Sequence, residues 1–267
     1  MARFDCGDGR TVYYEHHRGG ATPIVLIHGW AMSSRLWAGT VEGLKAAGHA
    51  VIVIDHRGCG QSDRDFDDMS IAALASDVEG IVRKETSRPV VLNGWSLGGA
   101  VAAEAARRLG DRAAGLVLTC GASPRFTKTA DFPYGGDHEG LAATAAALAT
   151  DRAGLFKGIA QSVCAREVSP ETVDWMWSAF IDSGPGVIAS LLDLGDIDQR
   201  ALLAALDMPV LSIIGSADAI LDPQIGIEAA KCAQNGTTTA FDGCGHAPFI
   251  EDAPKYLATL RDFMAGI

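Results

Sequence analysis

The sequence is poor in aromatic residues and in positive charge, and it has no long apolar run. Aromatic side chains make up 7% of the 267 residues, and 22 lysines and arginines stand against 33 aspartates and glutamates, a formal net charge of −11. A surface of that sign repels phosphate backbones and anionic lipids, so we expect neither nucleic acid nor a membrane as a partner. No uncharged apolar run approaches the roughly 18 residues needed to span a bilayer.

Cysteine pairs at redox or metal-binding spacing are also missing. No two of the six cysteines form a C-x-x-C pattern, and none joins histidines in a zinc-type cluster. The charged first ten residues lack the apolar core of a secretory signal. We therefore expect a cytoplasmic protein with reduced, mostly buried thiols and no metal. The cysteines are Cys6, Cys59, Cys120, Cys164, Cys232 and Cys244.

What is present is the alternating pattern of an α/β protein. Apolar runs typical of strands recur along the chain, and helical patterns lie between them. This alternation predicts a mostly parallel, doubly wound sheet. The expected strands are residues 12–16 (an edge strand), 23–27, 50–54, 90–93, 115–119, 209–214 and 237–241. The expected helices between them are 35–47, 70–85, 97–109, 199–206, 225–232 and 254–264.

The alternation stops between residues 122 and 190, where helical stretches occur without a convincing strand. These stretches are 141–149, 153–163 and 171–181. We expect residues 1–121 and 191–267 to form one core domain, with residues 122–190 inserted into it as a helical cap.

One short segment suggests a nucleophile. An apolar strand and an alanine-rich helix are joined by Gly94-Trp95-Ser96-Leu97-Gly98-Gly99. The string G-x-S-x-G is a weak signal alone, but this placement is that of a nucleophile elbow, a tight turn that pushes the serine hydroxyl out above the sheet. Glycines leave room there for neighbouring backbone. We therefore predict Ser96 as the nucleophile; the alternative is a glycine-rich turn with a helix-capping serine.

A serine hydroxyl needs a base to become reactive. His246 lies in the glycine-flanked segment 243–248, directly after the last expected strand, and we predict it as the general base. The alternative role for His246 is to stabilise its loop or to lie on the surface. His28 suits loop bracing, and His56 lies in another loop after a strand. The polar stretches that hold His16, His17, His49 and His138 indicate solvated side chains.

The base needs a carboxylate to orient it. Asp218 follows the expected strand 209–214 and so lies at the same edge of the sheet as the other two residues. The chain order Ser96, Asp218, His246 is the one expected of a hydrolase built on such an elbow. Asp222 is the rival in the same loop, but its place before Pro223 favours a helix-capping role.

Acyl transfer also needs donors for the developing oxyanion. We predict the backbone N–H groups of Leu97, next to the nucleophile, and Trp30, in the loop after an early strand. The Trp30 side chain is then free to line the substrate pocket, although plain core packing is the alternative. From the cap we add Phe126, Phe156 and Trp175 as substrate-binding residues. The other large apolar cap residues are expected in the cap's own core: Phe132, Met176, Trp177 and Phe180.

With these segments assembled, the chain resembles the α/β-hydrolase superfamily over nearly its whole length, the cap excepted. The segment 55–62 looks like that family's D-x-R-G-x-G-x-S loop. The elbow and the segments 122–126 and 246–250 are similar to the pimeloyl-acyl-carrier-protein methyl ester esterases of biotin synthesis. That resemblance implies an oxyanion hole at Trp30 and Leu97, and basic cap residues that hold an acidic carrier protein.

The cap departs from that pattern because its acidic residues outnumber its basic ones, a poor match for an acidic partner. We therefore expect a general serine carboxylesterase that acts on a small-molecule ester without a cofactor. The alternatives are the carrier-protein esterase, a lactonase, a C–C bond hydrolase or a perhydrolase with the same triad, and a non-catalytic ligand receptor. The basic cap residues are Arg125, Lys128, Arg152, Lys157 and Arg166; the acidic ones are Asp131, Asp137, Glu139, Asp151, Glu167, Glu171, Asp174 and Asp182.

Overall fold

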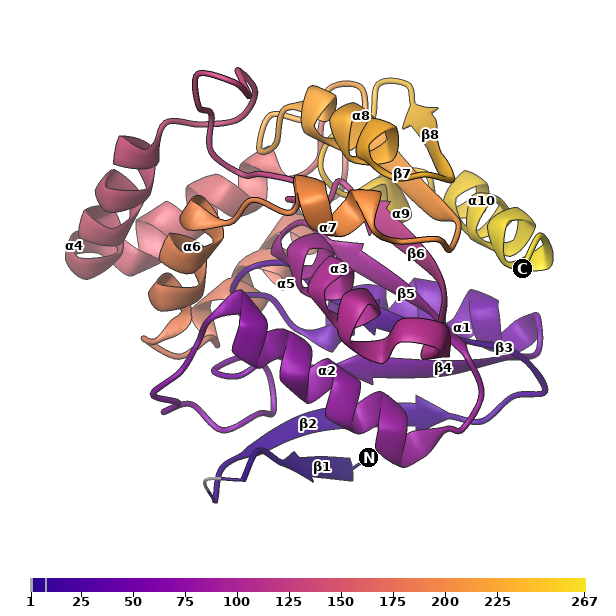
Figure 1. The fold of residues 1–267 in the computed structure, drawn as a ribbon. Helices are drawn as coiled ribbons and strands as arrows, with labels where there is room; N and C mark the ends of the chain where they lie inside the picture. Colours follow the sequence, from indigo (N-terminus) through magenta and orange to yellow (C-terminus); the bar gives the residue numbers. More distant parts are fainter. Residues whose placement is uncertain (1, 8) are drawn as a thin grey trace.

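The computed structural model describes residues 2–7 and 9–267, so Met1 and Asp8 of the expected core domain lie outside the described residues. One eight-stranded sheet runs through the described part of the chain (Figure 1). The strand pairs β1–β2 and β2–β4 are antiparallel, and all the others are parallel. The predicted mostly parallel sheet is therefore confirmed. In spatial order the strands are β1 (Ala2–Asp5), β2 (Thr11–His17), β4 (His49–Ile54), β3 (Ala21–Ile27), β5 (Val90–Trp95), β6 (Ala113–Thr119), β7 (Val210–Gly215) and β8 (Gly236–Phe241).

Helices cover both faces of the sheet, which explains why its central strands are continuous apolar runs. One face carries α2 (Ile71–Glu85), α3 (Leu97–Leu109), α7 (Arg200–Ala204) and α8 (Pro223–Cys232), and the other carries α1 (Ala38–Ala46) and α10 (Ala253–Ala265) (Figure 1). The alanines of α3 are fully buried, so this helix lies close against β5 and β6. Three short helical turns are η1 (Ser34–Trp37), η2 (Gly110–Arg112) and α9 (Pro248–Glu251).

The expectation that residues 12–16 form the edge of the sheet is wrong. β1 pairs outside β2, with Phe4 opposite Val12. Only two apolar residues alternate with Arg3 and Asp5 in β1, which is too short a pattern to indicate a strand. The strand is anchored through Phe4, whose ring lies against Gly80 of α2, where any side chain would overlap it.

Between β6 and α7 the chain forms α4 (His138–Ser162), α5 (Pro170–Ile181) and α6 (Val187–Asp196). The backbone of α4 is broken at Asp151 (φ −146°, ψ 73°), so its halves correspond to the expected helices 141–149 and 153–163. α6 was not expected, because Gly184, Gly186 and Gly195 flank its apolar run. The expected boundary at residues 190/191 falls inside α6. None of the described helices is both long and apolar enough to cross a membrane.

A closed ring of three hydrogen bonds ties the sheet to α10 beneath the elbow. The Thr119 hydroxyl donates to Asn93 Oδ1 at 2.9 Å, and Asn93 Nδ2 donates to the Tyr256 hydroxyl at 2.8 Å. The Tyr256 hydroxyl must then donate to Thr119 Oγ1, 2.8 Å away, because the threonine proton is already engaged. All three side chains are buried.

Removing one member of this ring leaves its partners buried without a hydrogen bond. Tyr256→Phe is expected to lower the free energy of unfolding by about 1–3 kcal/mol, measured by urea denaturation. Tyr134→Phe is the control, since no hydrogen bond joins the Tyr134 hydroxyl to another of residues 2–7 and 9–267, and a change within about 0.5 kcal/mol is expected. Equal stability of Tyr256→Phe and the unaltered protein would show that the ring contributes nothing.

Candidate active site

Ser96 occupies the single turn between β5 and α3, in a left-handed backbone conformation (φ 56°, ψ −124°). Such a conformation costs about 1–3 kcal/mol unless its surroundings hold it. Here the Ser96 N–H donates to the Thr119 carbonyl oxygen at 3.1 Å. The Ser96 carbonyl oxygen accepts from Gly99 and Ala122, each at 2.8 Å. Both backbone groups of Ser96 are thus engaged within the fold, and the side chain lines a cavity above the sheet.

The glycines around Ser96 are there because backbone approaches too closely for any side chain. A Cβ at Gly94 would overlap the carbonyl oxygen of Gly98. At Gly98 it would come within 2.5 Å of the Ile27 and His28 carbonyl oxygens. At Gly99 it would lie 2.7 Å from the Cα of Gly121, on the chain leaving β6. The glycines are therefore required by the packing of the elbow, not by the turn alone.

His246 and Asp218 face each other across two loops at the carboxyl ends of β8 and β7. His246 Nδ1 lies 2.7 Å from Asp218 Oδ2, and both side chains are almost fully buried. The second carboxylate oxygen, Oδ1, accepts the backbone N–H groups of Ile220 at 2.8 Å and Leu221 at 3.0 Å. With both oxygens engaged, the carboxylate has one orientation, which places the Nδ1 proton of His246 on its side.

Burial acts to raise the pKa of Asp218, but the facing His246 and the two backbone N–H groups outweigh it. The pKa is therefore below its ordinary value. Asp222, the rival carboxylate, accepts from the Gln224 N–H at 2.9 Å and caps α8. The two aspartates of this loop thus do different work: one faces the histidine and the other begins a helix.

The loop that carries His246 is fixed from two sides. Its backbone N–H donates to the carbonyl oxygen of Val163, at the end of α4, at 2.7 Å. Its carbonyl oxygen accepts from Trp95 Nε1 at 2.7 Å, and the Trp95 ring lies beside the imidazole with centroids 5.6 Å apart. Trp95, the residue before Ser96, therefore holds the loop of His246 directly.

Two backbone N–H groups lie free beside Ser96. Gly29 passes so close that a Cβ on it would be 3.1 Å from Ser96 Cβ, and Trp30, the next residue, lines the same cavity as Ser96. Leu97 is the first residue of α3, where helical N–H groups have no partner in the preceding turn. Among residues 2–7 and 9–267, neither N–H donates a hydrogen bond.

A pair of buried histidines braces the loop that holds Trp30. His28 Nδ1 donates to the Gly29 carbonyl oxygen at 2.7 Å, and His28 Nε2 accepts the His56 N–H at 3.0 Å. Burial lowers the pKa of His28 to about 4, with the Gly29 contact opposing, so this imidazole is neutral at pH 7. Its contacts match the expected loop bracing and leave no ring nitrogen for proton transfer.

Ser96 and His246 line one small cavity of about 50 Å³, bordered by α4 and α5. The Trp30 indole forms part of its wall, donates to the Val187 carbonyl oxygen at 2.7 Å and lies edge-on to Phe180. Trp30 therefore both lines the cavity and ties the core to α6. The remaining walls come from Gly29, Met32, Trp95, Ile159, Val163, Phe180 and Ile220.

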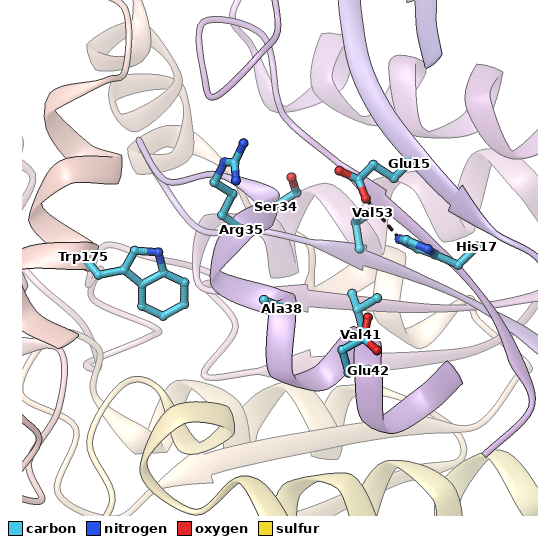
Figure 2. A pocket seen from close by; sticks show the side chains of 9 residues that line it. All are labelled: Glu15, His17, Ser34, Arg35, Ala38, Val41, Glu42, Val53 and Trp175. Atoms are coloured by element: carbon cyan, nitrogen blue, oxygen red, sulfur yellow. Dashed lines mark ion pairs between the residues drawn. The ribbon is translucent and has the colours of Figure 1, made fainter. Parts of the chain in front are cut away.

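The other three expected pocket residues lie elsewhere. Phe156 is fully buried, stacks on Phe180 (centroids 5.0 Å apart) and lies edge-on to Trp30 (5.7 Å), so it packs against two residues of the cavity wall. Phe126 is only partly buried and is not among the residues that line the cavity at Ser96. Trp175 is exposed and borders a separate surface hollow beside Arg35, Glu42 and the Glu15–His17 pair (Figure 2). Helical periodicity does not show which face of α4 or α5 points to the cavity. Phe180, not Phe126, Phe156 or Trp175, lines the cavity.

A cysteine near the aspartate and histidine was not anticipated. Sγ of Cys120 and the ligand atoms of Asp218 and His246 all lie within 4.8 Å of one another. Burial, with Asp218 nearby, raises the pKa of Cys120 well above its ordinary value, so it is a neutral thiol and a poor metal ligand. The sequence signal that could have placed Cys120 here is its position directly after β6, because β6 lies between the strands that lead to Ser96 and Asp218.

A family model described as the alpha/beta hydrolase fold matches residues 22–253. The chain belongs to this family. It is 29% identical to the AB hydrolase superfamily protein YisY of Bacillus subtilis, over 92% of each chain. It is also 29% identical to the pimeloyl-[acyl-carrier protein] methyl ester esterase of Stenotrophomonas maltophilia, over 91% of this chain and 93% of the relative. The esterase EaEST of Exiguobacterium antarcticum superposes with a TM-score of 0.94 at 25% identity, covering 98% of each chain. The predicted resemblance is thus confirmed.

The lowered pKa of Asp218 predicts how stability depends on pH. Its carboxylate stabilises the folded state above the ordinary aspartate pKa of about 3.9, and that contribution is lost as the pH falls through the lower folded-state value. Asp218→Asn should therefore be less stable than the unaltered protein at pH 5 in urea unfolding. The difference should narrow at pH 3; a difference that widens would contradict the assignment.

Proposed function

We propose that this protein is a serine carboxylesterase that hydrolyses small carboxylic esters through an acyl-enzyme intermediate. One arrangement carries the proposal. Ser96, in its strained turn, shares a cavity with His246, whose Nδ1 lies 2.7 Å from the buried Asp218 carboxylate. The esterases among its relatives and structural neighbours support the same reaction class.

In this proposal Ser96 Oγ attacks the ester carbonyl carbon while His246 Nε2 takes its proton. Asp218 accepts the Nδ1 proton, fixes the imidazole tautomer and stabilises the imidazolium. The unpartnered N–H groups of Trp30 and Leu97 stabilise the oxyanion, which forms where water is excluded. His246 then protonates the departing alcohol. Water attacks the acyl group with His246 again as the base, and the carboxylic acid leaves.

We further propose that residues 122–190 act as a cap over a core of residues 1–121 and 191–267, and that the cap selects short acyl groups. A cavity of about 50 Å³ is far below the 300–1,000 Å³ typical of sites for drug-sized ligands. A larger open hollow, of about 640 Å³, runs along α4 and shares Ile159 and Ile220 with the cavity. These two side chains divide the closed space at Ser96 from the open one.

The cap's basic residues favour a small-molecule ester over an ester carried on an acidic protein. Every one of the five is already engaged within the molecule, so an acidic partner would have to compete with existing contacts. Arg125 pairs with Asp198, Lys128 with Asp137, Lys157 with Asp174 and Arg166 with Asp252, while Arg152 donates to the Ser183 carbonyl oxygen.

A reducing cytoplasm is the proposed location. Cys59, Cys120 and Cys244 are buried, and burial raises the pKa of the Cys59 and Cys120 thiols, which keeps them protonated.

Removing the proposed nucleophile tests the reaction directly. Ser96→Ala should lower kcat on p-nitrophenyl acetate by about 10³-fold or more and leave the circular dichroism spectrum unchanged. Ser212→Ala is the control, because Ser212 on β7 is also buried and its hydroxyl has no partner among the described residues. That variant should keep its activity. Full activity in Ser96→Ala would remove the proposed function.

The size of the cavity predicts the acyl preference. On p-nitrophenyl esters of graded length, kcat/KM should be highest for acetate or propionate and fall at least tenfold by octanoate. Ile159→Ala should open the cavity toward the hollow along α4 and raise the ratio of kcat/KM for octanoate to kcat/KM for acetate. The exposed Ile181→Ala should leave the ratio unchanged. A preference for octanoate in the unaltered enzyme would refute the assigned pocket.

A further inference from the structure

Glu251, at the end of α9, receives backbone hydrogen bonds from two segments far apart in the sequence. Its carboxylate accepts the N–H of Gly245 at 2.9 Å and that of Ala247 at 3.3 Å. It also accepts the N–H groups of Ala165 at 2.8 Å and Arg166 at 2.9 Å. Four donors on one carboxylate make a charge-assisted cluster, which is stronger than the same bonds to a neutral acceptor.

The two segments are those whose relative position matters most to the site. Gly245 and Ala247 flank His246 on either side. Ala165 and Arg166 follow Val163, which lines the cavity and accepts the His246 N–H at 2.7 Å. The segments also touch elsewhere, since a Cβ at Gly245 would lie 2.6 Å from the Ala165 nitrogen.

A local role in the α9 turn explains only half of these contacts. A carboxylate near a helix start often reaches back to the N–H groups before it, and this accounts for Gly245 and Ala247. It does not account for Ala165 and Arg166, which come from the cap more than 80 residues earlier. The two carboxylate oxygens divide this work: Oε1 serves the histidine loop, while Oε2 serves the cap and shares Gly245.

We propose that Glu251 is a positioning residue that holds the cap segment 163–166 and the His246 loop together, so that His246 reaches Ser96 while the cap is seated. The inference rests on the proposed esterase function. It names a residue that acts through the histidine and does not touch the substrate. A glutamine at this position has one acceptor oxygen and presents an N–H₂ group to the remaining donors. A glutamine can therefore retain the hydrogen bonds to the histidine loop or those to the cap segment, but not both.

The test compares Glu251→Gln with Asp252→Asn on p-nitrophenyl acetate. Asp252 is the matched control because its carboxylate pairs with the Arg166 side chain at 3.1 Å, on the same surface, without holding the four N–H groups. Glu251→Gln should lower kcat about 10–100-fold, the effect of misplacing a proton-transfer group by about 1 Å, with KM within threefold. Asp252→Asn should stay within threefold of the unaltered enzyme in both constants.

Equal kcat for Glu251→Gln and the unaltered enzyme would overturn the positioning role. So would a fall in kcat matched by Asp252→Asn, or a rise in KM that accounts for the whole loss. If Glu251→Gln yields no folded protein, Glu251→Asp decides. Its shorter side chain cannot reach both segments, so kcat should fall about tenfold, and unchanged kcat refutes the role. Full activity in Ser96→Ala would instead refute the proposed esterase function, so failure of that proposal can be distinguished from failure of the positioning role.

Discussion

The left-handed backbone at Ser96 is the constraint on which the rest of the site depends. It turns the chain from β5 into α3 within one residue, so the hydroxyl faces outward while the Leu97 N–H is left without a partner. The cost of this conformation is offset by the hydrogen bonds of the Ser96 backbone to Thr119, Gly99 and Ala122. The close approach of the neighbouring backbone then makes glycine the only residue that fits at positions 94, 98 and 99.

The cavity is built from the loops at the carboxyl edge of the sheet and from helices α4 and α5. Polar groups come from the core, where the ends of parallel strands bring Ser96, Asp218 and His246 to one edge of the sheet. Apolar walls come from both sides: Ile159, Val163 and Phe180 from α4 and α5, and Trp30, Met32, Trp95 and Ile220 from the loops and strand ends of the sheet. The two parts are joined at the histidine loop itself, by the His246 N–H on Val163 and by the carboxylate of Glu251. A displacement of α4 relative to the sheet therefore changes the position of His246 as well as the shape of the cavity.

The sequence predicts features that depend on a residue's place along a strand, and it does not predict contacts that depend on how distant segments pack. The sheet and the nearness of Asp218 to His246 could be predicted, because each residue directly follows a strand and parallel strands end at one edge. The pocket could not, since Phe156, Phe180 and Trp175 carry the same apolar signal and only packing separates buried support, cavity wall and exposed surface. The apolar pattern of β1 was too short to predict a strand, and the glycines around α6 hid the helical pattern of its sequence.

Glu251 illustrates the same limit in the polar part of the structure. Its partners are main-chain N–H groups, which every residue but proline possesses, so the sequence carries no pattern for such a contact. The tight turn at Ser96 was predictable for the opposite reason, since the close approach of backbone around it requires glycine at several neighbouring positions and so leaves a sequence motif.

The most direct measurement of the central claim is the site of covalent attachment when a p-nitrophenyl alkylphosphonate, which mimics the tetrahedral intermediate, inactivates the enzyme. Intact mass and peptide mapping should find one adduct per chain, on Ser96, formed in step with the loss of esterase activity. Complete inactivation with Ser96 unmodified, or an adduct on another residue that tracks the loss, would contradict the account.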